Sequence, residues 1–125
     1  MFMVFLVLHD PSLLSDVLEA WDSAGVKGVT ILPSTGLRRL QSKDVLREDL
    51  PLIPSLEDLL QHEERLNRTL FSIVEGDEMV EKVVAATQSI TGDLNLPNTG
   101  ILTVLPVARV YGLDRKKLLD EEPDN

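Results

Sequence analysis

Hydrophobic residues in this chain form short runs between polar turns, and their spacing alternates between that of strands and that of helices. Phe2–Leu8 is a continuous apolar run, which is typical of a strand buried inside a sheet. The segment Asp10-Pro11-Ser12 combines capping side chains with a first-turn proline, and an apolar stripe at helical spacing follows it. That stripe consists of Leu14, Val17, Leu18, Trp21 and Ala24. The β-branched run 26–32 then predicts a second strand.

The same order of elements returns in the second half. Residues 69–75 alternate as a strand, and Gly76 opens a helix that ends at a glycine sixteen residues later. The inner stripe of that helix is Val80, Val83, Val84, Thr87 and Ile90. Residues 101–105 predict a last strand, which can continue to Val110 past a bend at Pro106. Two strand–helix–strand units of this size predict an α+β, ferredoxin-like fold, in which a four-stranded antiparallel sheet carries both helices on one face.

A chain of 125 residues is expected to form one compact domain with a single core, and here we predict that domain over 1–113. A long insertion, 37–68, separates its two halves, and loops of this length are usually functional or mobile. Within the insertion, 49–54 reads as an extended apolar segment because of its two prolines, and 55–60 reads as a short capped helix. The charged C-terminal residues 114–125 are predicted to be disordered.

The predicted strands are apolar on both faces, whereas two helices can cover only one face of the sheet. A large apolar face left open indicates self-association. The alternative is that the insertion folds back over this face. The many charged residues of the insertion favour self-association.

Composition excludes several classes of function. The net charge of −9 argues against nucleic-acid binding, which depends on cationic side chains at the phosphates. The chain has no cysteine, and neither His9 nor His62 has a second ligand at helical spacing, so a metal site is not predicted. No Ser-His-Asp set or carboxylate pair is evident, which argues against an enzyme. The N-terminal apolar run is too short to span a bilayer and lacks a basic flank, so we expect a cytoplasmic protein.

The turn that follows the second predicted strand is the first candidate for a ligand site. Pro33 stops the strand, and Ser34, Thr35 and Gly36 expose backbone N–H groups and two hydroxyls. Asn98-Thr99-Gly100 is a similar small-residue loop before the last strand. Both segments are also what ordinary turns look like, since these residues favour turns in any context.

Several segments together resemble the P-II nitrogen-regulatory family. These are Gly25-Val-Lys-Gly-Val-Thr30 with Gly36 beyond it, the long insertion, the strand–helix pair 69–91, and Thr91-Gly92 before a loop and strand. The resemblance covers the chain from Val4 to about Gly112 apart from the insertion. It implies a homotrimer with adenine nucleotides bound in clefts between subunits, and a long loop that responds to the ligand and docks on a partner protein.

Carried over residue by residue, the resemblance assigns Thr30 to the threonine that faces the adenine and Gly36 to a glycine at the base of the long loop. Where the family has Gly-x-Gly-x-Gln, this chain reads Gly36-Leu-Arg-Arg-Leu40, so the ligand for magnesium and 2-oxoglutarate is missing. The family's 2-oxoglutarate lysine, phosphate-loop lysine, paired arginines and modifiable loop tyrosine are also absent. The chain therefore resembles a divergent member that is not an orthodox sensor of 2-oxoglutarate.

From these observations we expect a P-II-like regulatory protein that binds an adenine nucleotide (AMP, ADP or ATP) or a small anion between subunits. Its insertion would contact an unidentified protein, either an enzyme or a membrane transporter. The alternatives are a trimeric scaffold with a degenerate site and a divalent-metal protein similar to the CutA family. The candidate ligand residues are Thr30, Ser34, Thr35, Gly36, Arg38, Arg39, Asn98, Thr99, Gly100 and Tyr111.

Overall fold

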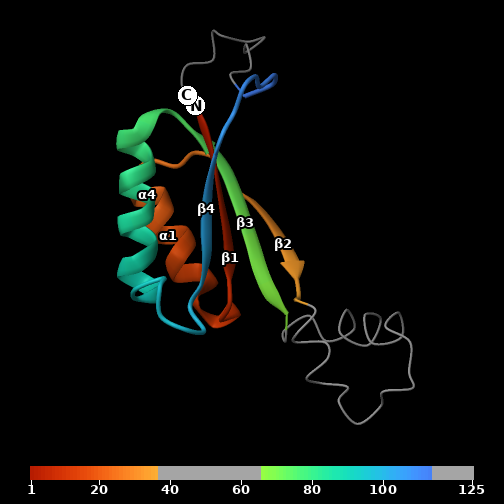
Figure 1. Cartoon of the computed structure of the whole chain (residues 1–125), viewed down its shortest axis with the longest axis vertical. Helices are drawn as coiled ribbons and strands as arrows, with labels where there is room; N and C mark the ends of the chain where they lie inside the picture. Colours follow the sequence, from red (N-terminus) through yellow and green to blue (C-terminus); the bar gives the residue numbers. More distant parts are fainter. Residues whose placement is uncertain (37–65, 114–125) are drawn as a thin grey trace, which may run out of the picture.

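A computed structural model describes residues 1–36 and 66–113 of the chain. These residues form an α+β structure in which one four-stranded sheet carries two helices on the same face (Figure 1). In chain order the elements are β1 (Phe2–Leu8), a 3-10 turn (Pro11–Leu13), α1 (Leu14–Ala24), β2 (Thr30–Ser34), β3 (Asn67–Val74), α4 (Gly76–Thr91) and β4 (Gly100–Pro106). The predictions made for 37–65 and for 114–125 lie outside the described residues.

The strand order is β2-β3-β1-β4, and every neighbouring pair is antiparallel. This order is that of the ferredoxin-like fold, so the predicted fold class is confirmed at the level of the single chain. The two long strands β1 and β3 occupy the centre, and β2 and β4 form the edges. The insertion leaves from the end of β2 and returns at the start of β3, where Ser34 pairs with Asn67.

The core lies between the sheet and the helices. Alternate residues of the central strand, Val4, Leu6 and Leu8, are fully buried against Val17 and Trp21 of α1 and their neighbours in α4. Both predicted helical stripes therefore face the sheet. Gly25 ends α1 at φ 108°, a left-handed conformation that suits glycine.

One buried polar contact ties the two helices together. The Trp21 indole Nε1 donates a hydrogen bond to the Thr87 Oγ1 at 2.8 Å, and this hydroxyl in turn donates to the Val83 carbonyl at 2.7 Å. Both side chains have no solvent exposure. The indole N–H, which is costly to bury alone, is thus satisfied across the helix interface.

Some predicted bounds were wrong. The second strand was predicted at 26–32 with Pro33 as its stop, but β2 runs from Thr30 to Ser34 and includes Pro33. β3 begins at Asn67, so it takes the last two residues of the predicted insertion. β4 ends at Pro106, so the predicted continuation of that strand to Val110 is also wrong. β2 begins late because the Gly28 carbonyl accepts a hydrogen bond from the Ser72 side chain of β3 and makes no ladder bond to the β3 backbone.

The face of the sheet opposite the helices is apolar and uncovered within the described residues. Phe5 and Phe71 stack at its centre with their ring centroids 5.4 Å apart. Around them the register places Met3, Val7, Leu32, Ile73, Ile101 and Leu105 on the same face, with Thr30 and Thr103 at its two edges. We call this set the open face. Arg68 is the only charged residue in the four strands.

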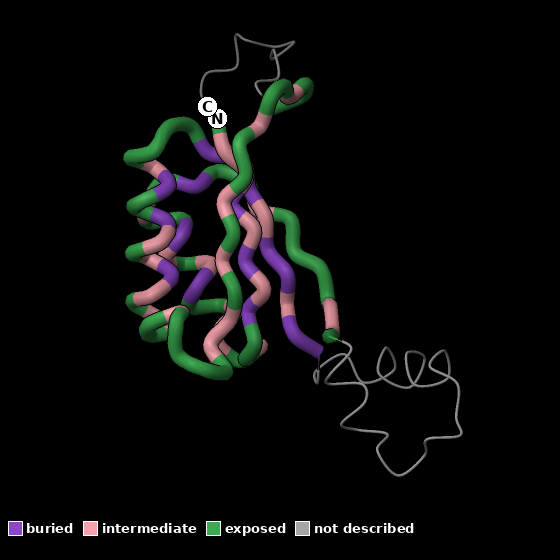
Figure 2. Tube along the Cα trace, viewed as in Figure 1, coloured by how far each residue is buried: buried purple, intermediate pink, exposed green. Residues whose placement is uncertain are grey.

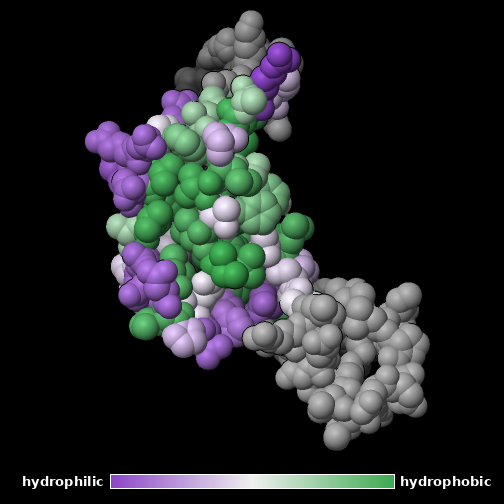
Figure 3. All heavy atoms as spheres, viewed as in Figure 1, coloured by the Kyte–Doolittle hydropathy of each residue, from purple (hydrophilic) through white to green (hydrophobic). Residues whose placement is uncertain are grey.

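Surface hydropathy follows the same division. Hydrophobic side chains gather over the β4 side of the molecule, and hydrophilic ones lie along the helix side and at the two ends (Figure 3). The helices carry acidic residues in their first turns: Asp16 in α1, and Asp77 and Glu78 in α4.

We predict that Thr87→Val destabilises the protein by about 1–3 kcal/mol, because it leaves the buried Trp21 N–H without an acceptor. Urea unfolding followed by the fluorescence of the single tryptophan measures this change. Thr91→Val on the same helix is the control, since its hydroxyl bonds only to the neighbouring Gly92 carbonyl. Equal stability of the Thr87→Val variant and the native protein would contradict the assigned role of the Trp21–Thr87 contact.

Candidate functional site

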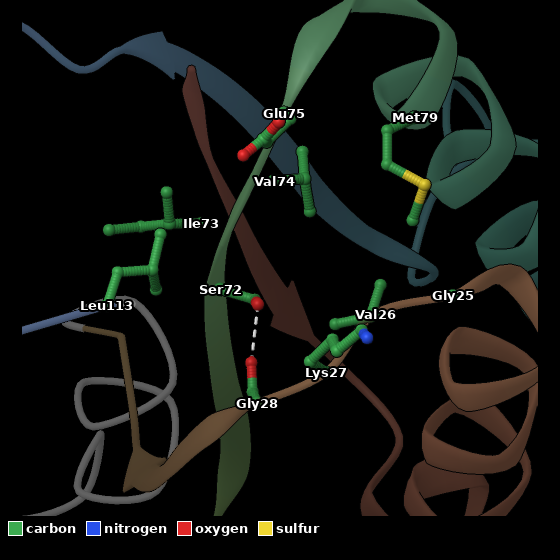
Figure 4. Close-up of a pocket in the computed structure, with 10 residues that line it drawn as sticks. All are labelled: Gly25, Val26, Lys27, Gly28, Ser72, Ile73, Val74, Glu75, Met79 and Leu113. Carbon is green, nitrogen blue, oxygen red and sulfur yellow. Dashed lines mark hydrogen bonds between the residues drawn. The ribbon is translucent and has the colours of Figure 1, made fainter. Parts of the chain in front are cut away.

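A pocket of about 420 Å³ lies where the edge of β3 extends beyond the start of β2 (Figure 4). We call it the notch. One wall is the segment from Gly25 to Gly28, and the other is the end of β3 and the start of α4. Its lining residues are Gly25, Val26, Lys27, Gly28, Ser72, Ile73, Val74, Glu75, Met79 and Leu113.

The notch exists because the ladder between β2 and β3 stops early. Thr30 pairs with Phe71, and no residue before Thr30 belongs to the ladder. Instead, the Ser72 hydroxyl donates a hydrogen bond to the Gly28 carbonyl (Figure 4). That carbonyl is therefore held by a side chain, and the strand that would continue along β3 is missing.

The alternation of backbone groups shows what faces the notch. Met1 accepts a hydrogen bond from Val107, and His9 donates one to Thr99, so the odd-numbered residues of β1 turn their backbones toward β4. In an antiparallel sheet successive residues turn to opposite neighbours. The even-numbered residues of β1 therefore bond to β3, and their partners in β3, which include Ser72, are even-numbered. Ile73 must then turn its N–H and C=O away from β1, into the notch.

Within the described residues, no backbone hydrogen bond joins Ile73 to Gly28. Pro33 supports this alternation. It lies opposite the even-numbered Arg68, which turns its backbone toward β1, so no N–H is required from Pro33 at this position. Ile73 thus presents one donor and one acceptor side by side at the wall of the notch. A planar heterocycle with a complementary acceptor and donor can bind to such a pair.

The rest of the notch is mostly apolar. Val26 and Val74 are each 5 % exposed, and Met79 and Leu113 add apolar surface. Of the residues that the structure describes, Lys27 and Glu75 are the two charged ones in the lining, and the Glu75 carboxylate points away from Met79 in Figure 4. Because Asp77 and Glu78 lie two and three residues after Glu75, the α4 side of the notch is acidic and disfavours the phosphate groups of a ligand on that side.

The predicted ligand residues do not meet in one place within a single chain. Ser34 ends β2 and is followed by Thr35 and Gly36, whereas Asn98 and Thr99 precede β4 and Gly100 begins it. Leu8 pairs with both Arg68 and Gly100, so both groups lie at the same end of the sheet. They lie at opposite edges, however, with β3 and β1 between them.

At this end, several hydroxyls already have partners. The Ser34 and Thr69 hydroxyls are 2.8 Å apart and share a hydrogen bond. The Thr99 hydroxyl donates to the Leu96 carbonyl at 2.9 Å and orders its own loop. The Thr35 hydroxyl, in contrast, is buried and has no hydrogen-bond partner. Of the hydroxyls of Ser34, Thr69, Thr99 and Thr35, only that of Thr35 therefore has no hydrogen bond within the described residues.

The backbone of the 98–100 loop is strained in a way that fixes its shape. Asn98 has a φ of 63°, and Gly100 has a φ of 147°. A Cβ at Gly100 would lie 2.5 Å from the Val7 carbonyl oxygen, so only glycine fits there. The loop is thus built to pack closely on the end of β1.

Thr30 and Tyr111 lie elsewhere. Thr30 is exposed on the open face, in the row next to Ile73, so it lies beside the notch. Tyr111 is 84 % exposed in the segment after β4, which continues beyond the opposite end of the sheet (Figure 1). Arg38 and Arg39 lie outside the described residues.

Sequence reasoning missed the notch and its residues Ile73, Ser72 and Met79. The available signal was Ser72, a hydroxyl at a helix-facing position between the apolar residues Leu70 and Val74. Its register partner Val4 is fully buried, so the hydroxyl needed an acceptor nearby, and Gly28 provides it.

No cluster of His, Asp or Glu side chains suited to a metal ion occurs in the part of the chain that the structure describes. In the same part, no helix combines the length and apolarity needed to cross a bilayer. The chain matches no protein-family model and no curated protein at a significant level.

We predict that Ser72→Ala loosens the segment before β2, because the Ser72–Gly28 hydrogen bond is its polar anchor to β3. Hydrogen exchange should become faster at residues 26–29. Ser34→Ala, which removes the hydroxyl contact at the other end of β2, is the control and should leave 26–29 unchanged. Unchanged hydrogen exchange at residues 26–29 in Ser72→Ala would mean that another contact anchors this segment to β3.

Proposed function

We propose that this chain is a P-II-like regulatory protein that assembles as a homotrimer and binds an adenine nucleotide at the notch, between neighbouring subunits. The observation that carries this proposal is the free N–H and C=O pair of Ile73 at the wall of an apolar pocket. Adenine offers an acceptor at N1 beside a donor at N6, which matches one N–H and one C=O of the same residue.

The position of Thr30 supports the same ligand. It lies beside the notch on the open face, so its hydroxyl is available to the edge of a ring that bonds to Ile73. The resemblance to the P-II family assigns this threonine to adenine recognition, and the Ile73 backbone lies in the neighbouring row of the sheet. Val26, Met79 and Leu113 supply apolar contacts for the ring faces.

The charge distribution affects which nucleotide fits. Among the described residues, Lys27 is the only cation in the notch lining, and the acidic first turn of α4 lies on one side of it. A nucleotide with one or two phosphates therefore suits the site at least as well as ATP, unless a neighbouring subunit adds cations. Arg38 and Arg39 remain candidates for that role.

The open face supports assembly. An uncovered sheet face whose centre is a stacked Phe5–Phe71 pair is the kind of apolar surface that monomers rarely expose. Closing three such faces toward a common axis removes them from water and creates the clefts between subunits. The number three comes from the resemblance to the P-II family. Regulation of a partner protein through the insertion, and a cytoplasmic location, belong to the same proposal.

For assembly, we expect light scattering to give the mass of three 13.9 kDa chains at micromolar concentration. Phe5→Asp should yield folded monomers, because it places a charge at the centre of the open face. Leu96→Asp is the matched control, since Leu96 is 57 % exposed in a loop outside the sheet. A native protein that stays monomeric would contradict the proposed assembly.

For the ligand, calorimetry with AMP, ADP and ATP should detect binding, and GMP, whose ring edge carries acceptor and donor at exchanged positions, should bind more weakly. Gly28→Leu should reduce the affinity at least about tenfold, because a side chain at Gly28 meets no atom within 4 Å and fills the notch. Thr30→Val should reduce it about three- to tenfold through the loss of one hydrogen bond.

The two results together separate the proposed function from its alternative. A trimer that binds none of the three nucleotides at millimolar concentration would favour an interaction scaffold with a degenerate site. Binding that Gly28→Leu leaves unchanged would place the ligand away from the notch.

A further inference from the structure

The direction of β3 fixes which way round an adenine ring lies in the notch. Along any strand, the N–H of a residue precedes its C=O. At Ile73 the C=O is therefore the group nearer the end of the strand at Val74. A ring that binds both groups places its acceptor over the N–H and its amino group N6 over the C=O. N6 thus lies toward the end of β3, and the C2 edge lies toward Thr30.

This orientation does not depend on which ring nitrogen is bound. Adenine can present N1 or N7 beside N6, and in both cases the donor is the amino group. One N6 proton goes to the Ile73 carbonyl. The second proton points onward along β3, beyond Val74, where it needs an acceptor of its own. A donor enclosed among apolar side chains without a partner weakens binding.

Glu75 lies at this end of the notch and belongs to its lining. It follows Val74 directly and keeps an extended backbone, with a φ of −99° and a ψ of 127°. It is therefore two residues, about 7 Å, beyond Ile73, and its side chain rises on the same face of the sheet. Figure 4 shows the carboxylate on the Ile73 side of Val74, pointing away from Met79.

No other described side chain of the lining offers an acceptor at this position. The Ser72 hydroxyl faces the Gly28 carbonyl on the opposite wall, and Lys27 carries only donors. The remaining lining side chains are apolar. Among side chains, the second N6 proton therefore has Glu75 as its acceptor.

The fold itself makes no use of the Glu75 carboxylate. The buried stretch of β3 ends at Val74, and the residues that open α4 are exposed (Figure 2). Glu75 is the N-cap residue of this helix, but its side chain makes no capping hydrogen bond. Within the described residues, no hydrogen bond or ion pair engages the carboxylate. It is thus available to a ligand.

We infer that the Glu75 carboxylate accepts the second N6 proton of the bound adenine, so that the notch selects nucleotides with an amino group at this ring position. The inference rests on the proposed adenine site and names the residue that reads the amino group. An ionised carboxylate only accepts hydrogen bonds, so it also disfavours a ring with a carbonyl oxygen at the same position, such as hypoxanthine or guanine. This role explains why the notch carries a negative charge although its proposed ligand is an anion.

Calorimetry with a matched pair of nucleotides tests this role. AMP and purine riboside 5′-monophosphate differ only in the amino group, so the ratio of their affinities measures how strongly the site reads that group. In the native protein AMP should bind more tightly. Glu75→Ala should lower the ratio at least about tenfold, because the charge-assisted contact to the amino group is lost. Glu75→Gln keeps a neutral acceptor and should retain part of the ratio.

Glu78→Ala is the matched control. Glu78 lies in the first turn of the helix that Glu75 precedes, and it is not part of the notch lining. Its removal takes away the same charge and should change the affinities for both nucleotides by the same factor, through their phosphate groups. The ratio should therefore stay as in the native protein. An equal fall of the ratio in Glu78→Ala and Glu75→Ala would overturn the inference, because the general charge of the helix end would then account for it.

The remaining outcomes separate this inference from the proposed function. AMP binding that Gly28→Leu weakens, with an affinity ratio that Glu75→Ala leaves unchanged, overturns the role of Glu75 and leaves the nucleotide site standing. Equal affinity of the native protein for the two nucleotides overturns both the role of Glu75 and the pairing of adenine with Ile73. Absence of AMP binding at millimolar concentration overturns the nucleotide site and this inference with it.

Discussion

Every residue of an antiparallel strand can turn its backbone groups to only one neighbour, and this constraint decides which groups of this molecule are free. Contacts at Met1 and His9 fix the odd-numbered residues of β1 toward β4. The whole sheet follows from that choice, including the turn of Ile73 into the notch. The proposed contacts of the adenine ring depend on it.

The second organising feature is the division of polar and apolar surface. The helices cover one face of the sheet and carry the acidic residues, whereas the strands contain Arg68 as their single charged residue. In the proposed assembly, this division would place the charged helices outside and the apolar face inside. Beside that apolar face, the notch offers polar backbone groups among mostly apolar side chains, where a hydrogen bond discriminates well between ligands.

The sequence predicted the fold class and both helices, because periodicity, caps and glycines agreed with one another at each element. It placed β2 too early, since a β-branched run cannot reveal that the Ser72 hydroxyl captures the Gly28 carbonyl. It expected Ser34–Gly36 and 98–100 near one another in one cleft, whereas β3 and β1 separate the two groups within a single chain. The central feature of the proposed ligand site, the Ile73 backbone, has no side-chain signature, so only the strand register reveals it.

The most direct test of the account is the amide signal of Ile73 in a nitrogen-15 NMR titration of the native protein with AMP. If the adenine ring bonds to this residue, the Ile73 amide should shift strongly downfield, and Thr30 and residues 26–28 should follow at the same midpoint. The signals of the acidic outer faces of α1 and α4 should stay in place. Saturable shifts that leave Ile73 and 26–28 unchanged, or no shifts at millimolar AMP, would contradict the notch as the nucleotide site.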